Sequence, residues 1–379
     1  MKEQNQISKN KEPFRMHKNH PSILNPDNGR QGASAMLRLG IWPFLLIGIT
    51  PMVTFVTPET HAGPNVEQVL TDLPLSDGDK HQIMEGEIVQ WTSTESSERE
   101  VVVGKALLVR GKQPSETIKI FRQAIGLTLD PDVRAFGKIA GKGTTTDFAK
   151  VMLEPNGESE AERYLEAEPG DELNLSSQEI SGLKILNVKG QSAADKKKVV
   201  EKLLRNQLLS RYQSYHAEGL TGIPPYARGR GKEVWAADEL VEATLAAKVL
   251  AKHAPAFFEV LLKYPDVKPP SLEEWYYWVN YEVSSRPNFI LLHRLALQAA
   301  DSFIVGERHF FVSHEYNSLQ AVGGLLSAKE GTLVIYLYRV STDKVAGFGS
   351  SIKRAAARML MGKPIRRLFE KLRAVAENG

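Results

Sequence analysis

The strand-rich segment 275–340 constrains the fold most. It holds five runs of β-branched and aromatic residues, most of them separated by short Gly, Pro or Ser breaks: Tyr276–Val283, Asn288–Gln298, Ser302–Tyr316, Leu319–Leu326 and Thr332–Val340. Such runs are typical of strands, and connections this short join antiparallel neighbours. An amphipathic pattern over 350–376 then predicts a final helix, which Pro364 kinks or splits. We therefore expect an α+β protein, with an antiparallel curved sheet and a long C-terminal helix.

The rest of the chain predicts further elements. Residues 63–80 suggest an irregular entry, and strands are expected over 86–91, 101–109 and 148–153. Pro114 opens a helix, and helical periodicity over 192–263 predicts one helix after Ser192, one over 236–253 and one from Pro255. We divide the chain into a leader (1–62), an N-terminal α+β part (63–191), an inserted helical block (192–270), and the meander with its C-terminal helix (271–379).

The leader predicts the compartment. Residues 39–58 carry no charge, Arg38 precedes them, and Thr60 and Ala62 place small side chains before a cut after Ala62. These are the parts of a secretory signal peptide, so we expect a periplasmic or secreted protein. The start codon stays open between Met1 and Met36. The alternative is an inner-membrane anchor formed by residues 37–56.

Charge and cysteine content exclude several classes of protein. Residues 1–62 carry seven Lys or Arg against four Asp or Glu, and the chain from Gly63 carries 41 of each. A chain without net charge gives no electrostatic reason to bind nucleic acid. The sequence has no cysteine, which excludes disulfides, thiol redox chemistry and thiolate metal sites.

Three histidines of the strand-rich segment are candidates for chemistry. His293 lies on an otherwise apolar strand face, which fits either a hydrogen-bonded core histidine or the polar contact of an apolar pocket. If 309–316 is one strand, His314 and Tyr316 share one face while His309 lies on the other. A metal held by both His309 and His314 would need a bulge, and no HExxH motif is present, so we expect no metal site.

Two charged residues complete the candidate ligand-binding set. Arg339 lies among apolar residues of the last strand, and Asp343 follows before the final helix. The set is His293, His309, His314, Tyr316, Arg339 and Asp343. No catalytic residue is assigned. The phosphate-binding P-loop, the dinucleotide fingerprint and the Gly-x-Ser-x-Gly elbow are all missing, so we expect no cofactor.

The C-terminal helix carries eight Lys or Arg against two Glu. A basic amphipathic helix can rest on an anionic membrane, so peripheral membrane contact is one interpretation. The other is a helix that packs its apolar stripe on the sheet and turns its basic residues to water.

The order of elements resembles a known architecture. Strands and a helix after Pro114, an interrupted middle, a meander and a long C-terminal helix resemble the START-like helix-grip fold of Bet v 1, polyketide-cyclase and lipid-transfer proteins. The helical block would be an insertion. The segments 226–229, 308–312 and 341–349 also resemble a group of exported proteobacterial proteins of unassigned activity, which implies a Gram-negative periplasm.

Three functions are compatible with these features. Sixteen of the 30 aromatic residues lie between Phe257 and Phe348, which fits either a sheet core or an apolar pocket. The first hypothesis is a non-enzymatic binder of an apolar small molecule or lipid, held under the C-terminal helix. The alternatives are a structural or interaction protein of the cell envelope, and a hydrolase or lyase that uses a histidine-containing polar cluster.

Overall fold

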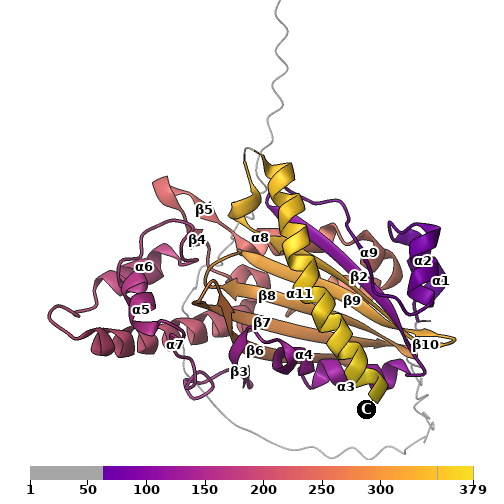
Figure 1. Ribbon diagram of the computed structural model, residues 1–379. Helices are drawn as coiled ribbons and strands as arrows, with labels where there is room; N and C mark the ends of the chain where they lie inside the picture. Colours follow the sequence, from indigo (N-terminus) through magenta and orange to yellow (C-terminus); the bar gives the residue numbers. More distant parts are fainter. Residues whose placement is uncertain (1–62, 348, 379) are drawn as a thin grey trace, which may run out of the picture. The chain divides into compact units, whose positions relative to one another are not determined.

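An antiparallel sheet forms the centre of the computed structural model, which describes residues 63–347 and 349–378. Eight strands lie in the order β1-β2-β10-β9-β8-β7-β6-β3 (Figure 1). Their bounds are β1 Val89–Trp91, β2 Glu100–Arg110, β3 Val133–Ile139, β6 Leu272–Val283, β7 Arg286–Ala299, β8 Ser302–Val312, β9 Ser318–Ala328 and β10 Gly331–Ser341. The predicted α+β class and antiparallel meander are confirmed, because β6 to β10 pair with one another in sequence order. The early strand β2 closes onto the last strand β10.

Three helices cover one face of the sheet. The long α11 (Ser350–Asn378) crosses it obliquely, and α3 (Pro114–Arg122) and α4 (Ile125–Leu129) lie beside it (Figure 1). Phe369 of α11 packs on Leu107 and Val109 of β2, while Ile118 of α3 packs among side chains of β7, β8 and β9. The helix is a single element, so it does not split at Pro364.

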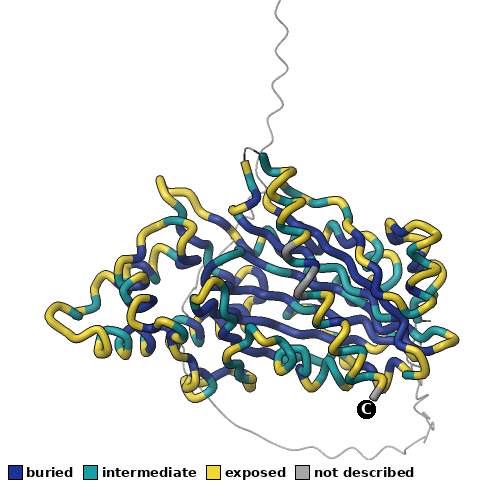
Figure 2. Tube along the Cα trace, in the orientation of Figure 1, coloured by how far each residue is buried: buried dark blue, intermediate teal, exposed yellow. Residues whose placement is uncertain are grey.

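The opposite face is covered by the remaining helices. These are α1 Val66–Asp72, α2 Asp77–Met84, α5 Gly157–Leu165, α6 Ser177–Lys184, α7 Ala193–Glu218, α8 Ala236–Leu245, α9 Lys248–His253 and α10 Pro255–Lys263, with the small ribbon β4 Tyr226–Ala227 and β5 Glu233–Val234. Two apolar clusters join them to the sheet, one around α5 to α7 and one around α1, α9 and α10. Figure 2 shows the central strands buried along most of their length.

The chain between β3 and β6 forms one long excursion from the sheet, which contains the helical block predicted over 192–270. All chain between β3 and β6, residues 140–271, leaves the sheet and returns to it, and α5 and α6 belong to it as well as α7 to α10. Because Ile139 pairs with Tyr276, the insertion leaves and re-enters at the same end of the β3–β6 pair.

Some predicted elements are wrong. Residues 63–80 form α1 and α2, which begin at the capping side chains of Asn65 and Ser76. Residues 148–153 form turns in place of a strand, and Phe148, Val151 and Leu153 point into the core from them. The expected helix over 236–253 breaks at Ala247, whose backbone is not helical. The predicted leader lies outside the described residues.

Candidate functional site

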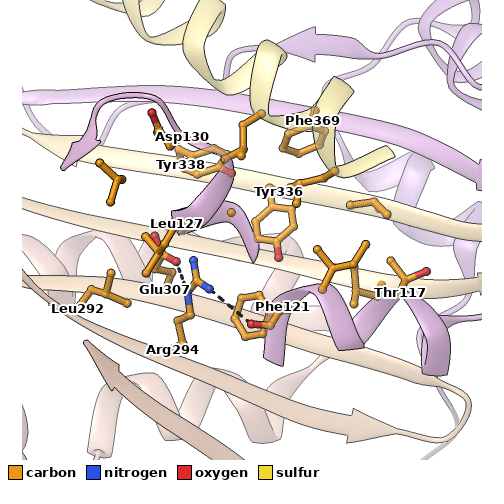
Figure 3. A pocket seen from close by; sticks show the side chains of 18 of the residues that line it. Thr117, Phe121, Leu127, Asp130, Leu292, Arg294, Glu307, Tyr336, Tyr338 and Phe369 are labelled. Carbon is orange, nitrogen blue, oxygen red and sulfur yellow. Dashed lines mark hydrogen bonds and ion pairs between the residues drawn. The ribbon is translucent and has the colours of Figure 1, made fainter. Parts of the chain in front are cut away.

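A cavity of about 200 Å³ lies between the sheet and the helices α3, α4 and α11 (Figure 3). Most of its lining is apolar, with Leu127 from α4, Leu292 from β7, Leu325 from β9 and Phe369 from α11 among the contributors. Within each strand, the residues that line the cavity are alternate ones, because every second side chain of a strand points to the same face. The cavity is therefore built into the fold, between the sheet and the helix that crosses it.

An ion pair forms the polar part of the cavity wall. Arg294 Nε donates to Glu307 Oε2 at 2.6 Å, from directly opposed positions on β7 and β8. The guanidinium also lies 5.2 Å from the ring centre of Phe121 and 5.9 Å from that of Tyr277. Two aromatic faces and a carboxylate thus fix the arginine, which leaves this part of the wall without net charge.

His309 and Tyr316 extend this polar chain. His309 Nε2 lies 3.1 Å from Glu307 Oε1, and its Nδ1 lies 2.7 Å from the hydroxyl of Tyr316. A carboxylate can only accept, so Nε2 carries the proton and Nδ1 accepts from the tyrosine. Burial alone would raise the pKa of Glu307, but Arg294 and the hydrogen bond from His309 lower it to about 2. Both histidine nitrogens are occupied, so His309 positions Glu307 and has no free nitrogen for a proton transfer to a ligand.

Two tyrosines of β10 supply hydroxyl groups to the cavity. Tyr336 and Tyr338 line it and are half-buried, and Tyr336 packs its ring edge-on against Phe369 of α11 (Figure 3). Burial raises the pKa of both phenols, so they stay protonated at neutral pH. Within residues 63–347 and 349–378, no group hydrogen-bonds either hydroxyl. Two phenol O–H groups are therefore free to bind an acceptor oxygen in the cavity.

The structure brings two of the predicted site residues to this cavity and places a third on the other face. His309 lines it and Tyr316 contacts His309. They meet because β8 ends at Val312 and the backbone turns at Glu315, whose φ is 78°. Residues 309–316 are therefore not one strand, and the predicted separation of His309 from Tyr316 onto opposite faces does not apply. His293 faces the opposite side and is fully buried, with Nδ1 3.0 Å from the hydroxyl of Tyr215.

The other three candidates lie in separate surroundings. His314 is buried in the turn after β8, and its Nε2 donates to the carbonyl of Pro287 at 3.1 Å. Arg339 points to the face opposite α11 and pairs with Glu100 at 2.8 Å. Asp343 accepts from Arg228 at 3.0 Å. The six candidates do not form one site.

Sequence reasoning missed Arg294, Glu307, Tyr336 and Tyr338. A signal was present for the first two: each is a charged residue within a largely apolar strand, and such charges are rare in buried strands unless paired. Their pairing depends on the register between β7 and β8, which the sequence does not state. The tyrosines carry no pattern that separates a core residue from a cavity residue.

In the part of the chain that the structure describes, no three His, Asp or Glu side chains are grouped to hold a metal ion. No helix within that part is both long and apolar enough to span a bilayer. Comparison with models of protein families, with curated proteins and with solved structures found no match to the chain.

Proposed function

We propose that this protein binds a small, uncharged and largely apolar molecule in the cavity under α11, and that it catalyses no reaction there. The observation that carries the proposal is the cavity itself: about 200 Å³ of space between the sheet and its crossing helix, with an apolar lining and two unpartnered phenols. A mostly apolar pocket with a few convergent polar groups is the usual form of a small-molecule site.

The topology supports a relationship to START-like helix-grip proteins. One early strand, β2, lies beside the last strand of a meander, two short helices follow β2, and the final helix crosses the sheet. In this interpretation residues 140–271 are an insertion and residues 63–91 an N-terminal addition. The space under the crossing helix is then where a ligand of such a fold is expected.

The size of the cavity favours a compact ligand over a long lipid. A buried apolar cavity of about 150 Å³ is large enough for benzene. A space of about 200 Å³ accordingly suits a molecule of one or two fused rings. A long acyl chain would require α11 or α3 to move away from the sheet.

The charges favour a neutral ligand. Arg294 is neutralised by Glu307, and the other two charged side chains of the lining are one acid, Asp130, and one base, Arg373, so the wall offers a ligand carboxylate no net positive charge. Tyr336 and Tyr338 can each donate one hydrogen bond, which suits a carbonyl or hydroxyl oxygen. The preferred ligand therefore combines an apolar ring system with one or two acceptor oxygens.

Localisation and membrane contact remain proposals from the sequence. We propose that the protein is exported through its predicted leader. Several basic side chains of α11 are occupied within the fold: Arg354 donates to the carbonyl of Glu98, Lys371 to that of Leu129 and Arg373 to that of Gly86. These contacts favour a helix that packs on its own sheet.

Binding can be tested with ligands of one size and different polarity. Isothermal titration calorimetry with naphthol, naphthalene and naphthoic acid should give the tightest binding for naphthol and the weakest for the acid at neutral pH. Leu127→Trp, which fills the cavity from α4, should raise the Kd of naphthol at least tenfold. The double variant Tyr336→Phe/Tyr338→Phe should bring naphthol and naphthalene to similar affinities.

A control variant separates cavity filling from general damage. Leu250→Trp places the same extra volume on the opposite side of the sheet and should leave naphthol binding unchanged. Circular dichroism melting should show all variants folded. Absence of binding by all three ring compounds, or equal loss in Leu127→Trp and Leu250→Trp, would contradict the proposal.

A further inference from the structure

A second and larger cavity lies on the face of the sheet opposite α11. It has a volume of about 490 Å³ and is bounded by β9 and β10, by α1 and α9, and by the segment that follows β1. Leu73, Val249, Leu250, Ile304 and Val322 line its middle and are all apolar. None of the six candidate ligand residues lies here except Arg339.

Small residues line part of this cavity. Gly324 of β9 points the same way as Val322 and Leu326, and a Cβ there would lie 2.7 Å from Leu326 Cδ2. Ala247 also lines the cavity, at the break between α8 and α9. The Leu326 side chain therefore packs over Gly324 and keeps this part of the lining apolar.

The cavity is elongated. Its lining runs along β9 from Leu326 to the level of Arg339, which pairs with Gln320, a distance of roughly 20 Å at the rise of a strand. At one end Arg339 reaches the carbonyl of Ala246, and at the other His253 contacts Asp72. A largely apolar lining of this length fits a single extended chain better than a ring system.

Two side chains that line the cavity have buried hydrogen-bond donors without a partner in the described part of the chain. The Arg339 side chain is 3% exposed, and its two terminal nitrogens are bound to Glu100, Thr94 and Ala246. Its Nε–H and the indole N–H of Trp91, which also lines the cavity, are buried and have no partner among the described residues. Buried donors without a partner cost free energy, and an acceptor oxygen would relieve that cost.

We propose that this cavity binds one long acyl chain, with the carbonyl oxygen at its end placed against Arg339 and Trp91. The apolar passage holds the methylene groups and the arginine end holds the oxygen. Such a carbonyl occurs both in a free fatty acid and in an ester. Because Glu100 already neutralises Arg339, the ester is the better fit. Lys248 also lines the cavity and has no ion pair among the described residues, so it would favour the acid.

The test uses three probes of equal chain length on the delipidated full chain. Hexadecanoic acid, its methyl ester and hexadecane are titrated against a bound fluorescent fatty acid analogue. We expect the ester to bind most tightly and hexadecane at least tenfold more weakly. An acid that binds tenfold more tightly than the ester would assign the site to free fatty acids. Failure of all three to displace the analogue would overturn the proposal.

Matched variants assign binding to one face of the sheet. Leu250→Trp and Leu337→Trp each fill this cavity and should weaken the ester at least tenfold, whereas Leu127→Trp, in the cavity under α11, should not. The paired variant Glu100→Gln/Arg339→Gln removes both charges together and should reduce the preference for ester over hexadecane. Ester binding lost in Leu127→Trp and retained in Leu250→Trp would place the chain under α11 and refute this site.

Discussion

Two buried titratable side chains give the stability of this protein an unusual pH dependence. His293 lies between Tyr215, Tyr276 and Glu274, and its ring stacks on Tyr276 at 4.2 Å. Burial lowers its pKa to about 4, although Glu274 opposes the shift. On α8, Glu239 accepts from Asn317 and Ser318, and burial raises its pKa to about 7. The two shifts act on stability in opposite directions.

The sign for His293 follows from its depressed pKa. Its ordinary pKa is 6.5, so between about pH 6.5 and pH 4 the unfolded chain binds a proton that the folded chain refuses. Stability falls as the pH falls through this window, by about 3 kcal/mol for the shift to about 4. His293→Gln, which keeps a hydrogen-bonding side chain, should remove this loss. Urea unfolding at pH 7 and pH 5 measures it, and an unchanged difference between the two pH values would contradict the assignment.

Glu239 gives the opposite slope. Its folded pKa of about 7 exceeds the ordinary 4.5, so its contribution is present below about pH 4.5 and is lost as the pH rises through 7. Glu239→Gln should therefore leave a protein whose stability increases from pH 5 to pH 7, since the opposing contribution of Glu239 is then absent and burial lowers the pKa of both His293 and His216. In the His293→Gln protein stability should instead decrease over the same range. The same urea titrations decide the matter, and parallel slopes in the two variants would exclude this account.

At the scale of elements, one device recurs near both edges of the sheet. Trp91 of β1 pairs with Gly104 of β2, and Trp278 of β6 pairs with Gly137 of the edge strand β3. A Cβ on Gly104 would lie 2.1 Å from the Trp91 ring, and one on Gly137 would lie 2.4 Å from that of Trp278. Each indole thus covers a glycine across the strand pair, which gives the outer strands side-chain packing that glycine lacks.

Gly104→Ala and Gly137→Ala should each destabilise the protein by about 1–3 kcal/mol, because the indole must leave its position in a packed layer. Gly182→Ala on α6 is the control. No atom lies within 4 Å of its added Cβ, and alanine is the better helix former, so a change between zero and about 1 kcal/mol of stabilisation is expected. Chemical denaturation with far-ultraviolet circular dichroism compares the three. Equal effects at all three glycines would rule out the packing explanation.

Elements could be predicted from the sequence where their patterns are long. Strands β6 to β10 were predictable because each holds eleven residues or more with strand composition and short breaks between them. The short α1 and α2 were missed, although Ser76 with Asp79 forms a capping box. Residues 148–153 look like a strand because Phe148, Val151 and Leu153 are apolar, yet they fill the core from turns. Tertiary packing determines the conformation of this segment, so local composition could not predict it.

The whole molecule determines the two cavities, and little of that is visible in the sequence. The meander and the amphipathic pattern predicted a cavity under the final helix. The residues that line it could not be predicted, because they depend on the register between strands. Arg294 meets Glu307 only through the pairing of β7 with β8. The second cavity depends on helices of the insertion, whose position on the sheet no local pattern gives. Histidines were predicted as site residues because their side chains can take part in chemistry. The polar part of the first cavity instead includes two tyrosines and an arginine that is paired with a glutamate.

The insertion is part of the core and cannot be removed as a separate domain. Residues 140–271 cover one face of the sheet, where Trp278, Phe289, Leu291 and Phe310 are each 1% exposed or less. Tyr215 of α7 stacks on Phe310 with 4.0 Å between ring centres. Replacing 140–271 by a flexible linker would join β3 to β6 at neighbouring positions but would expose these side chains as one apolar patch. Patches of this kind cause aggregation, so we expect an insoluble product.

Solubility and size-exclusion chromatography of the shortened chain test this expectation. A second shortened chain with Thr or Gln at the exposed apolar positions serves as the control, since it removes the patch while keeping the same linker. Recovery of soluble protein only in this second chain would identify the uncovered face as the cause. A shortened chain that is soluble, monomeric and cooperative in urea without those substitutions would mean that the sheet and α11 form an independent domain. The second cavity, which α9 of the insertion helps to enclose, would be lost in both shortened chains, so neither should bind the acyl ester.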